Sequence, residues 1–403
     1  MAHVSTLISE ILPELIALRH DLHSHPELGY QEHETARRVL ERLERLPGIS
    51  IRRNVAETGI IATLGAEKPG PCIALRADMD CLPIQEQTGR PYASKHPGRM
   101  HACGHDGHTT CLVGAATALA RLSDALHGPV KFIFQPAEEG GAGGRRMCEA
   151  GALDDPRADA IFALHGWPLM ELGTAGCRIG PSLASTNPFE IIVHGVGAHA
   201  AYPHKGIDPI LIASHIVVAL QSVVSRNTDP NDACVVTVGA IEAGTAENII
   251  PPSARMRGTI RTLNPQLRGR AVQRVREIAQ RIADAFDGRA DVNIREGYPV
   301  TVNEPTATEF FLQTARETLG DDAVDPNVPP SLGGEDFAFY GERIPAAFWR
   351  LGVRPRGVEN FPNLHQPTFD FPDDAIPIGV RLHCELALRF AREWAVQILP
   401  ASR

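Results

Sequence analysis

The sequence predicts an α/β protein with a discontinuous host domain and a smaller inserted domain. Three observations support this fold class. The chain has 403 residues, which is too long for one compact core. Its first part alternates helical patterns with short apolar runs, and its middle part follows a different order, β-α-β-β-α-β. Its composition, 43% apolar and 22% charged, is that of an ordinary globular protein.

The host domain begins with two predicted helices. Apolar residues recur at three- and four-residue spacings over 4–20, and a second helical pattern covers 31–46. Short runs of apolar and β-branched residues then predict strands at 59–64, 72–77, 130–135 and 160–165, with a helix at 108–122 among them. Several runs lack polar–apolar alternation, which predicts a mixed sheet covered on both faces by helices.

The pattern changes at about residue 189. The order strand, helix, strand, strand, helix, strand is predicted over 189–194, 209–226, 234–241, 254–263, 265–286 and 291–297. This order builds a ferredoxin-like (split βαβ) sandwich, in which two helices cover one face of an antiparallel sheet. Helical patterns at 306–319 and 375–399 return to the host domain. We therefore expect residues 185–298 to be inserted between 1–184 and 299–403.

Charge and composition exclude several functional classes. The net charge is −9, from 39 Lys plus Arg against 48 Asp plus Glu, and no long basic run occurs, so we expect no nucleic-acid partner. The most apolar window, Leu211–Leu220, is interrupted by Ser214 and His215, so we expect no membrane span. The N-terminus lacks a secretory pattern and the 8 Cys form no dense framework. These features predict a cytoplasmic protein with mostly reduced thiols.

An excess of histidine gathers in one segment. The chain has 17 His but only 5 Tyr and 3 Trp, and Met100–His108 holds three His, one Cys and one Asp. Thiolate and imidazole are preferred ligands of borderline-soft ions such as Zn²⁺. Cys103 and His105 are two residues apart, so their side chains can point the same way from an extended segment. The alternative is a polar loop in which Asp106 caps the next helix.

Two adjacent carboxylates follow the strand predicted at 130–135. Glu138 and Glu139 lie at the carboxyl edge of that strand, where open α/β sheets place ligand sites. One of them can bind a metal ion while the other transfers a proton. The alternative is a solvated loop, because neighbouring carboxylates repel each other.

Other potential ligands lie near the ends of other segments. His165 ends the strand at 160–165, and His365 precedes the last long helix. Asp78 and Asp80 leave a buried strand two residues apart, as metal ligands or, as we favour, as acceptors that orient a ligating histidine. The chain contains no H-E-x-x-H, G-x-S-x-G or Walker sequence. Metal-assisted hydrolysis is therefore the chemistry that the sequence predicts.

Together the motifs resemble a known family. The chain contains in order Arg76–Asp80, Met100–Asp106, Gln135–Gly140, His199–His204, Gly334–Phe337 and His365. This set resembles the aminoacylase and carboxypeptidase-G-type metallopeptidase family, in its hippurate hydrolase and N-acyl-amino-acid amidohydrolase branch. The resemblance covers nearly the whole chain. It implies hydrolysis of the amide bond of N-acyl amino acids, hippurate-like or N-acetyl, which releases a carboxylic acid and a free amino acid.

The resemblance also implies a metal centre. Two divalent ions, Zn, Mn, Co or Ni, would be held by Cys103, His105, Glu139, His165 and His365. Five ligands are too few for two separate four-coordinate shells, which agrees with Cys103 as a bridging ligand. Glu138 would act first as general base and then as general acid.

The inserted domain resembles a lid and dimerisation domain. The resemblance implies that His199 stabilises the oxyanion, in its own subunit's site or in the partner's. Asn248 and Arg261 would hold the amide and carboxylate of the substrate, and Gly334 would offer a backbone N–H group. The alternatives are that His199 caps a turn and that Arg261 is an exposed strand residue. The expected partners are thus a small N-acyl amino acid and a second copy of the chain, in a homodimer or higher homo-oligomer.

Other interpretations of the sequence remain open. A dipeptidase or carboxypeptidase on the same scaffold would differ in whether the acyl group carries an amine. A protein that only binds or stores metal is a further alternative, which the pair Glu138 and Glu139 disfavours. Cys81 stands where many relatives have a small residue. It is either a packing change or a second thiol able to form a disulfide with Cys103 on oxidation.

Overall fold

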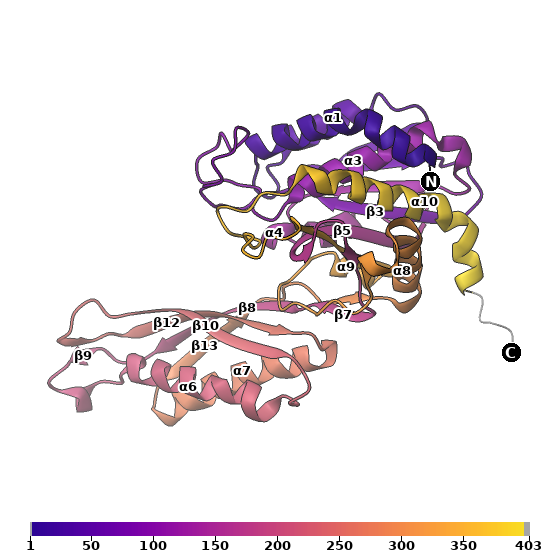
Figure 1. Cartoon of the computed structure of the whole chain (residues 1–403). Coiled ribbons are helices and arrows are strands. Elements are labelled where there is room, and N and C mark those ends of the chain that lie inside the picture. The colour runs from indigo at the N-terminus through magenta and orange to yellow at the C-terminus, as the bar shows by residue number, and fades with distance from the viewer. Residues whose placement is uncertain (1, 399–403) are drawn as a thin grey trace, which may run out of the picture. The chain divides into compact units, whose positions relative to one another are not determined.

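The computed structural model describes residues 2–398 and divides the chain into two compact units (Figure 1). The larger unit comprises the chain up to Gly180, Val302–Pro329 and the chain from Asp336 onward. The smaller unit comprises Pro181–Thr301 and Pro330–Glu335. These compact units differ from the boundaries expected from the sequence at residues 181–184, 299–301 and 330–335.

A mixed sheet of eight strands forms the framework of the larger unit, in the order β1-β2-β4-β3-β5-β16-β6-β15. Strands β4, β3, β5 and β16 are parallel neighbours, whereas β2 runs antiparallel to β4. Every residue of β2, β3 and β4 is buried, which confirms a sheet covered on both faces. The strands are β1 Ile49–Val55, β2 Gly59–Leu64, β3 Cys72–Asp78, β4 Val130–Gln135, β5 Ala158–Glu171, β6 Ala175–Gly176, β15 Val324–Asp325 and β16 Ala346–Arg354.

Helices α1, α3 and α10 contact one another, and α3 and α10 pack on β3 (Figure 1). The three helices approach closely at Gly114 of α3. A Cβ atom there would lie 2.6 Å from Val380 Cγ2 and 2.8 Å from Leu15 Cδ1. The helices of this unit are α1 Ala2–Ser24, α2 His33–Leu43, α3 His105–Arg121, α4 Glu138–Gly141, α5 Gly143–Glu149, α8 Pro305–Leu319, α9 Ala338–Gly341 and α10 Ile376–Ile398.

The smaller unit has an antiparallel sheet in the order β10-β12-β8-β13. Burial alternates along β8, so one face of the sheet is covered, and α6 and α7 pack there. The bounds are β8 Ser185–His194, α6 Pro209–Asn227, β10 Cys234–Ala243, β12 Ser253–Thr262, α7 Pro265–Ala285 and β13 Arg289–Ile294. Each of these elements overlaps its predicted range. The short strands β7 Gly180–Leu183, β9 Ala198–His199, β11 Ile249–Ile250 and β14 Thr301–Asn303 were not predicted.

Helix α6 is more apolar than the sequence analysis assumed. Within residues 2–398 it is the one helix that is long and apolar enough to span a membrane. Its buried residues recur at helical spacing and belong to the core of the smaller unit: Ile212, Ala213, Ile216, Leu220 and Val223. This pattern is typical of a helix that packs on a sheet.

The close contact at Gly114 has a measurable consequence. Helix propensity alone predicts that Gly114→Ala stabilises α3. The added methyl group would instead overlap Val380, so we expect the free energy of unfolding to fall by about 1–3 kcal/mol. Urea unfolding followed by circular dichroism measures the change. The matched control is Gly269→Ala in α7, where nothing lies within 4 Å, and a gain of roughly 0.5–1 kcal/mol is expected there. Equal effects from the two substitutions would contradict the packing argument.

Candidate metal and active site

The register of the sheet brings the ends of β3 and β4 level with His165, which lies inside β5 and not at the end of a strand as predicted. Asp78, the last residue of β3, pairs with Gln135, the last residue of β4. Because Arg76 pairs with Ala163 of β5, Asp78 is also level with His165. Parallel strands present their carboxyl ends at the same edge, so the loops that follow β3 and β4 start beside His165.

Cys103 lies on the loop that enters α3, and His105 is the first residue of that helix. Gly104, between them, has φ +86°, which a residue with a side chain rarely adopts. His105 Nδ1 lies 2.9 Å from the Asp80 carbonyl oxygen and 3.2 Å from Asp80 Oδ1. His105 Nε2 is buried and has no hydrogen-bond partner. The contacts at Nδ1 therefore leave Nε2 as the atom available to a ligand.

His165 faces Cys103 in a similar way. Its Nδ1 lies 2.8 Å from the carbonyl oxygen of Gly166 and its Nε2 lies 3.4 Å from Cys103 Sγ. With the proton on Nδ1, Nε2 carries the lone pair beside the sulfur atom. The imidazole of His165 and the thiol of Cys103 are thus placed so that both could bind the same metal ion.

The Glu138–Glu139 pair is fixed by its backbone. The preceding residue, Ala137, has φ +52°, and Glu139 donates its N–H to Asp80 Oδ2 at 2.9 Å. Glu138 is buried, at 6% exposure. Glu139 Oε1 lies 3.3 Å from Nε2 of His365, whose own N–H donates to the carbonyl oxygen of Ala102 at 2.8 Å. The loop before α10 is thereby joined to the loop before α3.

These contacts form two groups of potential ligands that share one residue. In each group the ligand atoms lie within 4.8 Å of one another. The first group is Cys103, His105 and His165, and the second is Cys103, Glu139 and His365. Glu138 lies within the same distance of His105 and Glu139. The structure therefore brings all five predicted ligands and the predicted base together.

The residues of this cluster fit divalent cations. His105 Nε2 is buried without a hydrogen-bond partner, and Glu139 Oε1 is buried and forms no hydrogen bond beyond its 3.3 Å ion-pair contact with His365, whereas buried polar atoms normally have a hydrogen-bond partner. The donors combine thiol, imidazole and carboxylate, which suits ions such as Zn²⁺ or Mn²⁺. Carboxylates at 78, 80, 138 and 139 supply negative charge that a cation can balance.

Asp78 and Asp80 are placed as hydrogen-bond acceptors of histidines. Asp78 Oδ1 is 2.7 Å from His108 Nδ1, and its Oδ2 accepts from Arg76 at 2.7 Å. Although burial alone would raise it, His105 and Arg76 hold the pKa of Asp78 well below its usual value. Asp78 Oδ2 is 3.7 Å from His105 Nε2, and Asp78, His105 and His108 form a further group whose potential ligand atoms lie within 4.8 Å of one another.

His108 is a residue to which the sequence analysis assigned no role. Its Nε2 accepts the N–H of Gly166 at 2.8 Å, while its Nδ1 faces Asp78. It therefore connects the end of β3 to the residue after His165. Its position one helical turn after His105 was the signal that could have identified it.

Asp106 belongs to a buried ionic network rather than to a helix cap. The residue before α3 is Gly104, and no side chain caps that helix, so the capping alternative is wrong. Asp106 Oδ2 contacts His23 Nδ1 at 2.9 Å and Arg19 Nη1 at 3.3 Å. Arg19 also pairs with Asp370 at 2.9 Å. The network joins α1, the first turn of α3 and the segment after His365, and the spacing of Arg19 and His23 on one face of α1 was its only signal in the sequence.

The four remaining predicted residues lie in the smaller unit, in two places. His199 of β9 pairs with Ile249 of β11, next to Asn248, whose carbonyl oxygen accepts the N–H of Ala200 at 3.0 Å. Arg261 lies near the end of β12, and its Nε donates to Thr259 Oγ1 at 3.1 Å. A Cβ atom on Gly334 would be 3.0 Å from Arg261 Nη1. His199 thus adjoins Asn248, and Gly334 adjoins Arg261.

The cysteines form no disulfide. All eight lie among the described residues and are buried thiols. Burial raises the pKa of the Cys81 thiol, so this side chain is a poor nucleophile and poor metal ligand as it stands. A disulfide between Cys81 and Cys103 is absent, and the packing interpretation of Cys81 fits its 3% exposure.

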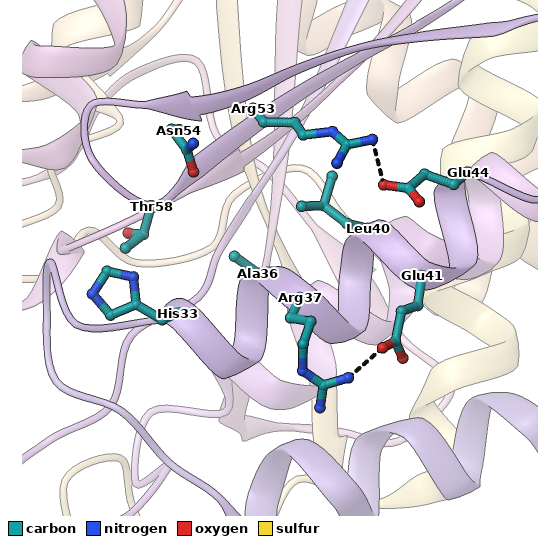
Figure 2. A pocket seen from close by; sticks show the side chains of 9 residues that line it. All are labelled: His33, Ala36, Arg37, Leu40, Glu41, Glu44, Arg53, Asn54 and Thr58. Atoms are coloured by element: carbon teal, nitrogen blue, oxygen red, sulfur yellow. Dashed lines mark hydrogen bonds and ion pairs between the residues drawn. The ribbon is translucent and has the colours of Figure 1, made fainter.

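A separate surface pocket of about 300 Å³ lies beside α2 and the turn from β1 to β2, and Figure 2 shows its lining. Its charges are largely paired, since Arg53 contacts Glu44 at 2.6 Å and Arg37 contacts Glu41. Thr58 also lines the pocket, and its hydroxyl group donates a hydrogen bond to a buried carboxylate. No group of potential metal ligands among the described residues includes a residue of this pocket.

Comparison with known proteins agrees with the geometry. Residues 74–389 match the model of peptidase family M20/M25/M40, and the chain belongs to this family. It is 42% identical to the N-acetyl-L-cysteine deacetylase of Bacillus subtilis (strain 168), over 92% of this chain and 86% of that protein. It is 41% identical to IAA-amino acid hydrolase ILR1-like 2 of Arabidopsis thaliana, over 96% of this chain and 87% of that protein.

A solved structure is similar over the same length. The Bacillus subtilis YXEP protein, described as a dinuclear metal binding peptidase from the M20 family, superposes with a TM-score of 0.79 at 38% identity. The match covers 95% of this chain and 99% of that one. The family and fold expected from the motifs are therefore confirmed, and the protein is a hydrolase of this metallopeptidase family.

The buried pair of His23 and Asp106 predicts a pH dependence of stability. Although burial alone would lower it, Asp106 and Glu86 raise the pKa of His23 to about 9. The folded-state pKa exceeds that of an unfolded His, about 6.5. The pair therefore stabilises the fold fully below pH 6.5, and this contribution, on the order of 3 kcal/mol, is lost as pH rises through about 9. We expect the unfolding free energy of His23→Gln, measured by urea titration, to depend less on pH between pH 6.5 and 9.5 than that of the wild type. The control is His127→Gln, because His127 is exposed. If the unfolding free energy of His23→Gln changes with pH as steeply as that of the wild type, the proposed role of the His23–Asp106 pair is refuted.

Proposed function

We propose that the protein hydrolyses the amide bond of N-acyl amino acids and releases a carboxylic acid and a free amino acid. One observation supports this most directly. The buried carboxylate of Glu138 lies within 4.8 Å of His105 and Glu139, beside two ligand groups that share Cys103. A base next to a metal pair is one arrangement that hydrolyses an unactivated amide. The names of the deacetylase and hydrolase relatives support the same substrate class.

We propose that two divalent ions bind this cluster. His105 and His165 would hold one ion, Glu139 and His365 the other, and Cys103 both. When bound, such ions lower the pKa of water and polarise a carbonyl group. Asp80 orients His105 for this role, and the Gly166 carbonyl oxygen orients His165. Zn, Mn, Co and Ni all remain candidates, because the donor set mixes soft and hard atoms.

Glu138 performs the proton transfers in this proposal. Its carboxylate removes a proton from the attacking water and later gives that proton to the leaving nitrogen, which departs as an amine. The backbone of Glu139 is held by Asp80, so the neighbouring Glu138 has a fixed location relative to His105. Burial of Glu138 keeps bulk water away from the transferred proton.

We propose that the smaller unit is the lid and the dimerisation domain. Its exposed apolar side chains are the surface that a second copy would cover: Ile210, Leu211 and Val218 of α6, and Ile249 of β11. A homodimer or a higher homo-oligomer would bury them. A cytoplasmic location remains a prediction from the sequence.

The geometry of β12 favours sites that are shared between subunits. His199 and Asn248 adjoin β11, which directly precedes the start of β12 at Ser253. Arg261 lies eight residues further along the strand, or roughly 26 Å at the usual rise per residue. An N-acyl amino acid is too short to contact both ends. We therefore propose that each substrate meets Arg261 and Gly334 of one subunit and His199 and Asn248 of its partner.

The hydrogen bonding of His199 suits an oxyanion donor. Ala201 donates its N–H to His199 Nδ1 at 3.1 Å. A neutral imidazole that accepts at Nδ1 carries its proton on Nε2. Nε2–H is then the donor that can stabilise the negative charge on the carbonyl oxygen.

The role of Glu138 is tested by Glu138→Gln. The amide keeps the shape but cannot accept the proton, so we expect kcat to fall by at least about 10³-fold with KM nearly unchanged. Hippurate and N-acetyl amino acids are assayed with added Zn²⁺, Mn²⁺, Co²⁺ or Ni²⁺, and Gly-X dipeptides serve as the comparison. Glu149→Gln, on the exposed end of α5, is the control. Near-normal turnover of Glu138→Gln would eliminate the proposed mechanism, and preference for free dipeptides would favour a dipeptidase.

The sharing of sites is tested by mixing two inactive variants. Loss of one oxyanion donor costs about 10²–10³-fold in kcat, so His199→Ala should be nearly inactive, like Glu138→Gln. If His199 acts in the partner's site, a heterodimer of the two variants has one intact site. Random mixing then restores about a quarter of the wild-type activity. Coexpression with two different tags isolates the heterodimer, and an inactive heterodimer would show that His199 acts in its own subunit.

A further inference from the structure

Glu32 is a buried carboxylate that lies outside the metal cluster. It has 0% exposure and directly precedes α2, yet it makes no capping hydrogen bond to that helix. Glu27 does this instead, since Glu27 Oε2 accepts from both N–H and Oγ1 of Thr35 at 2.8 and 3.0 Å. The carboxylate of Glu32 is therefore available for another purpose.

Its two oxygens bind two other segments. Oε1 accepts the N–H of Ala137 at 2.8 Å, and Oε2 accepts the hydroxyl of Thr58 at 2.6 Å. Thr58 lies between β1 and β2 and lines the pocket of Figure 2, and Ala137 immediately precedes Glu138. The contact with Ala137 joins the start of α2 to the segment that carries the predicted base.

Ala137 needs such a tether because its backbone is strained. Its φ of +52° and ψ of +47° are in the left-handed region, which costs a residue with a side chain roughly 1–2 kcal/mol. Its surroundings are close as well. A Cβ atom on Gly29 would be 2.9 Å from the Ala137 Cβ, and one on Gly141 would be 2.6 Å from it. Strained residues persist where their surroundings hold them, and the hydrogen bond from Ala137 to Glu32 is part of that support.

The backbone is thus held on both sides of Glu138. Glu32 binds the N–H of Ala137, and Asp80 binds the N–H of Glu139 at 2.9 Å. We propose that Glu32 is a positioning residue, whose carboxyl group keeps Ala137 left-handed and so holds Glu138 and Glu139 in place beside His105. Its effect on turnover rests on the proposed function, whereas its effect on the backbone does not.

Protonation of Glu32 is compatible with this role. Burial, together with the charge of Asp80, raises the pKa of Glu32 to about 7. A protonated carboxyl group keeps one oxygen that accepts from Ala137 and can donate its proton to Thr58 Oγ1. Glutamine has the same capacity, because its carbonyl oxygen accepts and its NH₂ group donates. The neutral amide is therefore a conservative replacement, and alanine removes both contacts.

The proposal is tested with Glu32→Ala, Glu32→Gln and Thr58→Val. Thr58→Val removes the other hydrogen bond of Glu32 but leaves the one to Ala137. The first measurement is hydrogen–deuterium exchange of a peptide spanning 134–142 in protein free of metal. We expect exchange to increase at least tenfold in Glu32→Ala and to stay within threefold of wild type in the other two variants. Unchanged exchange in Glu32→Ala, or an equal increase in Thr58→Val, would overturn the proposal.

The second measurement is the split between kcat and KM on the best N-acyl substrate. A misplacement of about 1 Å at a catalytic group can cost 10²-fold, so we expect kcat of Glu32→Ala to fall 10- to 100-fold with KM within threefold. Glu32→Gln should keep kcat within threefold, and an equal loss in both variants would overturn the acceptor role. If Glu32→Ala does not fold, Glu32→Asp, which is one methylene shorter, replaces it with the same expectations. If wild type cleaves no N-acyl substrate, the proposed function fails and the exchange measurement alone decides the role of Glu32.

Discussion

The side chain of Asp80 holds the two halves of the candidate site together. Its Oδ1 lies 3.2 Å from His105 Nδ1 and its Oδ2 accepts the N–H of Glu139 at 2.9 Å. One carboxylate therefore sets the distance between the loop that enters α3 and the loop that leaves β4. It can do so because β3 ends two residues earlier, at Asp78, in the centre of a buried parallel sheet. The register of β3, β4 and β5 thus determines where the cluster of potential metal ligands lies.

Much of the fold was predictable because the spacing of apolar residues in the sequence follows the pattern of burial in the helices and strands. The fully buried strands β2, β3 and β4 were found as apolar runs, and the smaller unit was found from its alternation and helix spacing. Strand β1 was missed because it lies at the sheet edge with exposed Arg52 and Arg53. Strand β16 was missed because Arg350 interrupts an apolar run, although its side chain is buried. A local pattern cannot show that Arg350 stacks over Trp167, 3.9 Å from its ring.

The candidate site was predictable only where its residues lie close together in the sequence. Cys103, His105, Glu138 and Glu139 stand in short motifs, so their residue types alone indicated metal-assisted hydrolysis. The supporting groups could not be found in this way, because their partners are far away in the sequence. Asp106 is 83 residues from His23, and Glu32 is 105 residues from Ala137. Nothing in the sequence near either residue indicates which partner it has.

Several residues around the cluster have positive φ, which is costly for a residue with a side chain but not for glycine. Gly104, Ala137 and His365 all have positive φ, and each adjoins or is one of the predicted ligands or the base. Left-handed turns reverse the chain sharply, which lets one loop present neighbouring side chains to the same point. The cost is offset by hydrogen bonds at the strained residues themselves, to Glu32 at Ala137 and to Ala102 at His365. Hydrogen bonds to Asp80, Glu32 and Ala102 thus fix the loops that carry the predicted ligands and the base, which lowers the entropy cost of ordering the chain when ions bind.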